Sequence, residues 1–168
     1  MRAEEAIDAV TLAATAAGLP AQDATVVRVG ENGVVLLPSA GVLARVVPRV
    51  VEDRDPRWEI EVAVWLASRQ VPVVHPTRPE PIVVERYVVS LWEYLPDSRP
   101  ADLVTLAKCL RRLHAVDIPT NLLPSLSPFD NFEERLQVGV GLDIGDRVFL
   151  RQLRDQLSAR SGPLRNSR

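Results

Sequence analysis

The amino-acid sequence predicts an α+β fold, in which a five-stranded antiparallel sheet with one inserted helix precedes a helical region. Three observations predict it. Short β-type segments are joined by tight turns, a helical segment separates the third from the fourth, and only helical periodicity follows Pro100. Tight turns connect antiparallel strands, whereas parallel strands need long crossovers. We therefore expect two parts, residues 1–95 and residues 96–168.

The first part begins with an alanine-rich helix over residues 1–17, which Gly18 ends. Three strands follow. The turn after the first, Gly30-Glu31-Asn32-Gly33, has the composition of a tight hairpin, in which Asn-Gly favours positive φ. The second strand turns into the third through Pro38-Ser39-Ala40-Gly41. We expect these strands over residues 24–29, 34–37 and 42–47.

Asp55 and Pro56 then predict the start of a helix that continues to about Gln70. Its apolar residues, Trp58, Val62, Trp65 and Leu66, fall on one face. The last two strands are expected over residues 81–85 and 87–94, with a sharp turn near Glu85-Arg86.

The second part is expected to contain helices only: one whose apolar residues run from Leu103 to His114, and two over residues 128–138 and 146–159. The first has an apolar stripe that ends at His114, which we interpret as a core histidine. In the last helix we expect four apolar residues to point inward: Val148, Phe149, Leu153 and Leu157. Asp143-Ile144-Gly145 is interpreted as a turn that enters this helix, not as a metal-binding motif.

Composition excludes several function classes. The 168 residues carry a net charge of −2, which argues against a broad basic surface for nucleic acid. One cysteine, Cys109, excludes an internal disulfide and a cysteine zinc site. No apolar run is long enough to span a membrane, and the N-terminus lacks a signal-peptide core. We therefore expect a cytoplasmic protein that does not associate with a membrane, does not bind nucleic acid and does not hold a metal ion of its own.

Five segments of the chain together form a recognisable pattern: Gly30 to Pro38, Val42 to Val46, Glu59 to Leu66, Leu91 to Pro96 and Leu110 to Ala115. In this order they resemble the aminoglycoside phosphotransferase family, kinase-like enzymes that phosphorylate hydroxyl groups of small molecules. The resemblance implies a protein-kinase-like small lobe over residues 1–95, which binds ATP, and the first helices of a large lobe over residues 96–168.

The resemblance implies a cation on the third strand that holds the ATP phosphates and a helix carboxylate that holds the cation. Lys108 is the only lysine of the chain, so Arg45 is the expected cation. Glu59 is the expected partner, six residues before Trp65, and Glu61 is the second choice. The alternative is that Arg45 and both carboxylates are ordinary solvated residues.

Two backbone segments complete the implied nucleotide site. Gly30, Asn32 and Gly33 lie where kinases place a loop over the phosphates, although an ordinary hairpin turn explains them equally well. Glu93 and Leu95 are the expected hinge residues, whose backbone groups would bind adenine. The alternative there is an edge strand with core aromatic residues.

The sequence contains no His-Gly-Asp, the loop that supplies the catalytic aspartate in this family, and neither histidine precedes a glycine. We therefore expect a chain truncated before the catalytic loop, with no catalytic residues of its own and no kinase activity. Mg²⁺ and a small-molecule hydroxyl acceptor are expected only for a complete relative. The alternative is a pseudokinase remnant that binds nucleotide or protein, and an exposed apolar face of the incomplete helical part predicts self-association.

Overall fold

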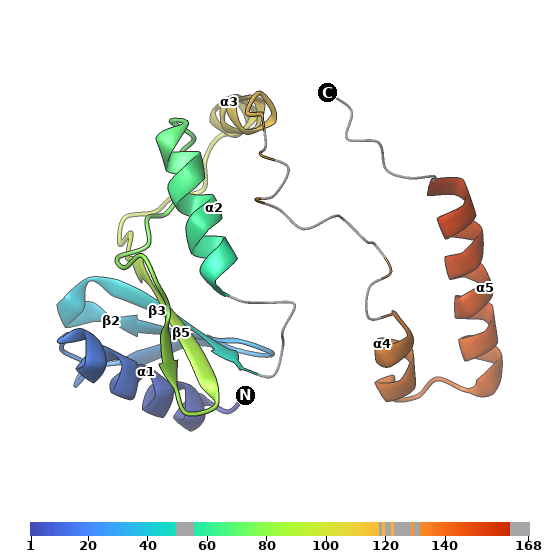
Figure 1. The fold of residues 1–168 in the computed structure, drawn as a ribbon, viewed down its shortest axis with the longest axis horizontal. Coiled ribbons are helices and arrows are strands. Elements are labelled where there is room, and N and C mark those ends of the chain that lie inside the picture. The colour runs from blue at the N-terminus through green and yellow to red at the C-terminus, as the bar shows by residue number, and fades with distance from the viewer. Residues whose placement is uncertain (50–55, 118, 120–121, 123–128, 130–131, 162–168) are drawn as a thin grey trace. The chain divides into compact units, whose positions relative to one another are not determined.

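The structure is a computed structural model that describes residues 1–49, 56–117, 119, 122, 129 and 132–161. Within these residues it confirms an α+β fold with a five-stranded antiparallel sheet, in the order β1-β2-β3-β5-β4 (Figure 1). The strands are β1 (Thr25–Val29), β2 (Gly33–Leu37), β3 (Val42–Pro48), β4 (Ile82–Val84) and β5 (Tyr87–Glu93). The helices are α1 (Ala3–Ala17), α2 (Pro56–Ser68), α3 (Leu103–His114), α4 (Phe132–Val138) and α5 (Ile144–Ser161), with a 3₁₀ turn, η1 (Pro38–Ala40).

The chain divides into two compact units, Met1–Leu123 and Pro124–Arg168. The first holds the sheet with α1, α2 and α3, and the second holds α4 and α5. The resemblance implies a different boundary, near residue 95, between a small and a large lobe. That division into lobes stays a prediction. The expected helix start at Asp55 lies outside the described residues.

Helix α1 covers one face of the sheet, which we call the α1 face. Its buried residues are small, four alanines and Val10, and small side chains let a helix lie close to strands. The strands contribute alternate residues to this core, as half-buried strands do. These are Val35, Leu37, Val42, Ala44, Val46, Tyr87, Val89 and Leu91, all at most 7% exposed.

Both ends of α1 are capped. The Glu5 carboxylate accepts hydrogen bonds from the backbone N–H of Arg2 at 3.0 Å and from its guanidinium. These hydrogen bonds lower the pKa of Glu5 to about 2. At the other end Gly18 has φ +69° and its N–H bonds to carbonyls of the last turn, the glycine ending expected from the sequence.

The opposite face of the sheet, which we call the α2 face, is only partly covered. The register places Val34, Arg45 and Ser90 side by side on β2, β3 and β5. Leu36, Leu43 and Trp92 form the neighbouring row, and all three are half-buried. Helix α2 contacts this face at β5 and through an ion pair to β3.

The hairpin between β1 and β2 forms as predicted, but the reason given for its glycines is wrong. Neither Gly30 nor Asn32 nor Gly33 has a positive φ. Gly33 is required instead by a close approach of α1, because an added Cβ would lie 2.9 Å from the Cβ of Ala6 and 2.7 Å from the Sδ of Met1.

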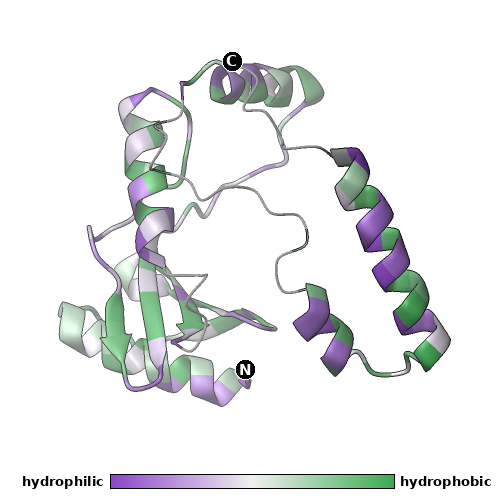
Figure 2. Ribbon diagram, turned by 45° about the vertical axis from the view of Figure 1, so that its right-hand side comes forward, coloured by the Kyte–Doolittle hydropathy of each residue, from purple (hydrophilic) through white to green (hydrophobic). Residues whose placement is uncertain are grey.

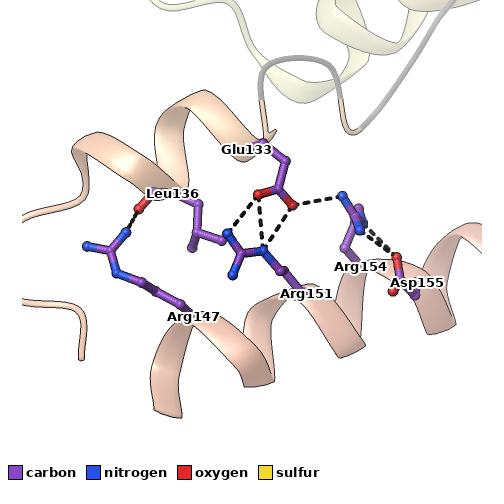
Figure 3. Close-up of polar contacts among 6 residues, drawn as sticks. All are labelled: Glu133, Leu136, Arg147, Arg151, Arg154 and Asp155. Carbon is purple, nitrogen blue, oxygen red and sulfur yellow. Dashed lines mark hydrogen bonds and ion pairs between the residues drawn. The ribbon is translucent and has the colours of Figure 1, made fainter. Parts of the chain in front are cut away.

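In the second unit α4 and α5 are held together by arginines (Figure 3). The Glu133 carboxylate accepts from Arg151 at 2.9 Å and from Arg154 at 3.1 Å, and the hydrogen bonds from Arg151 lower the pKa of Glu133. Arg147 donates to the Leu136 carbonyl, at the end of α4. Arginines of α5 therefore link the two helices of the second unit.

Asp143 begins α5 through reciprocal hydrogen bonds with Asp146. The Asp143 carboxylate accepts from the Asp146 N–H at 2.8 Å, and the Asp146 carboxylate accepts from the Asp143 N–H at 3.2 Å. Both carboxylates serve the first turn of the helix. This agrees with the interpretation of Asp143-Ile144-Gly145 as a helix entry.

Two expectations for the helical region are wrong. His114 is exposed, not a core residue. Apolar and polar residues alternate along α5 (Figure 2). The four residues of α5 expected to point inward are exposed by 37–61%. Amphipathic spacing identifies an apolar stripe, but burial also requires a partner for it, and within the described residues neither helix has a buried residue. None of the described helices has the length and hydrophobicity to cross a membrane.

Candidate functional site

Arg45 lies in the middle of the sheet, on the α2 face. Its strand β3 is paired on both sides, with Val34 of β2 and Ser90 of β5 opposite Arg45. The alternation of β3 turns Ala44 and Val46 to the buried α1 face and Arg45 to the partly open one. A cation at the centre of a strongly paired sheet has a fixed position.

Glu59 of α2 forms an ion pair and a hydrogen bond with Arg45. Each of the two side chains is 26% exposed, so the pair is partly shielded from water. Glu61, the other carboxylate considered, is exposed. Helix periodicity explains the difference, since Glu59 lies one turn before Ala63, which is buried.

Ser90 is a residue of the α2 face that the sequence analysis did not identify. It is fully buried, and its Oγ accepts a hydrogen bond from the indole N–H of Trp92 at 2.9 Å. This bond orients the ring on the same face as Arg45. Residues two apart on a strand share a face, so the Ser-x-Trp spacing was the available signal.

The segment after β5 carries backbone groups that are free to bind a ligand. The Tyr94 N–H donates to the Gly41 carbonyl at 3.0 Å, which makes Val42 and Glu93 a non-hydrogen-bonded pair. The Glu93 carbonyl therefore faces away from β3. The Glu93 N–H is already used by the His75 carbonyl at 2.9 Å, whereas within the described residues the Leu95 N–H has no partner.

The β1–β2 turn offers less than the sequence suggested. The Gly30 N–H donates to the Asn32 carbonyl at 3.0 Å, and the Gly30 carbonyl accepts from the N-terminal amine at 3.2 Å. Gly33 is buried under α1. In this conformation Gly30 has no backbone donor left for a phosphate, and the phosphate role of Gly30, Asn32 and Gly33 stays a prediction.

The backbone groups after β5 and the side chains of the α2 face follow one another along β3. Glu93 is paired with Val42 of β3, and Arg45 lies three residues further along that strand, a rise of about 10 Å. Half-buried Leu43 and Leu36 lie between the free backbone groups and the cation. The arrangement therefore offers hydrogen-bonding groups, an apolar surface and a fixed cation along one line.

Metal ligands are not part of this arrangement. Among the residues that the structure describes, no group of three or more His, Cys, Asp or Glu side chains is placed to hold a metal ion. The carboxylate on the α2 face, Glu59, is occupied by Arg45. A pocket elsewhere on the first unit, along α3, is lined by Leu103, Val104, Ala107, Lys108 and Arg111 and includes none of the predicted site residues.

Comparison of the chain with known protein families, with curated proteins and with solved structures found no match.

Proposed function

We propose that the first unit binds an adenine nucleotide on the α2 face, in the manner of the small lobe of a protein-kinase-like phosphotransferase. The observation that carries the proposal is the Arg45–Glu59 ion pair between the centre of the sheet and α2. A strand cation held by a helix carboxylate is how kinase-like lobes position nucleotide phosphates. Guanidinium also suits phosphate, because it donates two parallel hydrogen bonds.

The segment after β5 and the apolar row beside Arg45 support the same ligand. The Glu93 carbonyl and the Leu95 N–H form an acceptor and a donor two residues apart, which matches the amino group and the neighbouring ring nitrogen of adenine. Leu36 and Leu43 would contact the base or the ribose, and Arg45 would meet the phosphates.

Binding without catalysis is the activity proposed for these residues. Phosphoryl transfer depends on an aspartate that orients the acceptor hydroxyl and on side chains that hold Mg²⁺. The sequence contains no His-Gly-Asp, and the described residues offer no metal cluster. Mg²⁺ would therefore be carried by the nucleotide, and transfer to a small-molecule hydroxyl is proposed only for a relative with the catalytic loop.

The test is calorimetric titration of the purified chain with ATP and ADP, with and without Mg²⁺. We expect saturable binding that Arg45→Gln weakens by about 10-fold or more, the loss of one charge-assisted contact. Arg69→Gln is the matched control. It removes the same charge, and Arg69 is an exposed residue at the end of α2.

Removing Arg45 alone leaves the Glu59 carboxylate facing the phosphates. The double variant Arg45→Gln/Glu59→Gln removes this repulsion, so it separates loss of the cation from the effect of an unpaired carboxylate. Binding that is equal in the wild type, Arg45→Gln and Arg69→Gln would overturn the proposal.

A further inference from the structure

A bulge in β1 changes which residues of that strand face α2. Val26 pairs with Val35 and belongs to the core under α1, and the next pair along the ladder is Arg28 with Val34. Val27 is therefore an extra residue. Bulges re-aim side chains, and they are frequent beside functional sites.

Without the bulge, alternation from Val26 would turn Arg28 toward the α1 face. With it, Arg28 lies opposite Val34, which is itself opposite Arg45, so the three residues share the α2 face. Gly33 gives an independent check. A Cβ on Gly33 would meet Met1 and Ala6 of the α1 side, so Val29, its partner, belongs to the α1 face and Arg28 to the other.

The charges on the α2 face explain what Arg28 would add. Arg45 is neutralised by Glu59, so the pair by itself brings little net attraction for an anion. Arg28 is exposed and has no hydrogen-bond or ion-pair partner for its side chain within the described residues. It is therefore an uncompensated positive charge on this face, among the residues that the structure describes.

The spacing sets the class of ligand. One strand separates β1 from β3, which places the Cα atoms of Arg28 and Arg45 about 10 Å apart. Glu59 holds the Arg45 side chain in place, so Arg45 cannot move toward Arg28. An anion that contacts both arginines at once must therefore be long enough to extend across Val34, which lies between them. A polyphosphate chain meets this requirement better than a single phosphate ion.

We propose that Arg28 is a second phosphate-binding residue of the α2 face, turned there by the β1 bulge, and that Arg28 and Arg45 together bind a polyphosphate chain. The proposal rests on the proposed function, because it assigns the phosphates of the nucleotide. Arg45 is the fixed contact, and Arg28 provides attraction for the incoming anion and a contact from the other side of Val34.

Calorimetric titrations with inorganic tripolyphosphate and with ATP, at low and moderate salt, test this directly. We expect Arg28→Gln to weaken binding of both ligands by about 10-fold and to reduce the salt dependence of the affinity. Arg28→Lys, which keeps the charge, is expected to retain most of the affinity. Arg69→Gln serves again as the charge-matched control, and Arg28 is exposed, so its variants are expected to fold.

The outcomes separate the two proposals. Arg28-dependent tripolyphosphate binding, with ATP binding no more tightly, would support Arg28 and overturn adenine recognition. ATP binding that depends on Arg45 but responds equally to Arg28→Gln and Arg69→Gln would overturn the role of Arg28 and leave the nucleotide site standing. No binding of either ligand by the wild type would overturn both.

Discussion

The substitution Glu59→Gln measures the ion pair on which the site depends. Exposed ion pairs contribute about 0–1 kcal/mol, whereas breaking a fully buried pair costs about 3–5 kcal/mol. The two side chains here keep 26% exposure, so the pair lies between these limits. We expect Glu59→Gln to lower the free energy of unfolding by about 1–2 kcal/mol.

Urea denaturation followed by tryptophan fluorescence is a suitable assay, because all three tryptophans of the chain lie in the first unit. A double-mutant cycle with Arg45→Gln isolates the pairwise energy from the other effects of each change. Glu61→Gln removes the same charge from an exposed position two residues away, so it is the matched control.

The reasoning would be refuted if Glu59→Gln and Glu61→Gln had equal effects and the cycle gave a coupling energy near zero. A coupling of about 1–2 kcal/mol would show that Glu59 holds Arg45 in solution. Nucleotide affinity adds a second readout. Glu59→Gln is expected to weaken binding less than Arg45→Gln, because Glu59 acts by positioning Arg45.

Two predictions concern the α1 side of the sheet. Gly33→Ala is expected to lower stability by about 1–3 kcal/mol, because its Cβ would lie 2.9 Å from another side chain, whereas Gly30→Ala meets nothing within 4 Å. Equal melting temperatures for these two variants would contradict this account of the turn. Glu5→Gln is expected to lower the melting temperature at pH 6. Folding lowers the pKa of Glu5 from 4.5 to about 2, so its contribution is complete above pH 4.5 and is lost as pH falls through about 2. Melting curves from pH 6 to pH 2.5 should therefore show the difference shrinking toward acid, and a constant difference would contradict it.

Local patterns predicted the sheet and the helices well. The strands were short and rich in valine, and glycine or proline flanked most of them, while the longer helices carried apolar stripes. The Arg45–Glu59 contact was also predicted, from the family resemblance. The strand and helix periodicities agree with it, because they place Arg45 and Glu59 on facing sides of β3 and α2.

The sequence could not reveal features that depend on the partner of an element. The β1 bulge inserts Val27 relative to β2 and changes the face on which Arg28 lies. Strict alternation would have placed Arg28 on the wrong face. The need for glycine at Gly33 likewise comes from α1, far away in the sequence.

The exposure of His114 and of Phe149 has the same origin. An amphipathic pattern says which side of a helix is apolar, but burial depends on what lies against it. The exposed stripe expected on α3 is present, with Leu103, Leu106 and Leu110 each at least 45% exposed. Self-association through that stripe stays a prediction, which sedimentation of the wild type against Leu106→Ser would test.

The most direct measurement is a map of backbone amide shifts in the ¹⁵N-labelled chain during titration with ADP. The account predicts the largest shifts at the Leu95 amide and around Arg45 on β3, with smaller shifts along α3. Saturable shifts confined to α3, or none at either segment, would contradict binding on the α2 face.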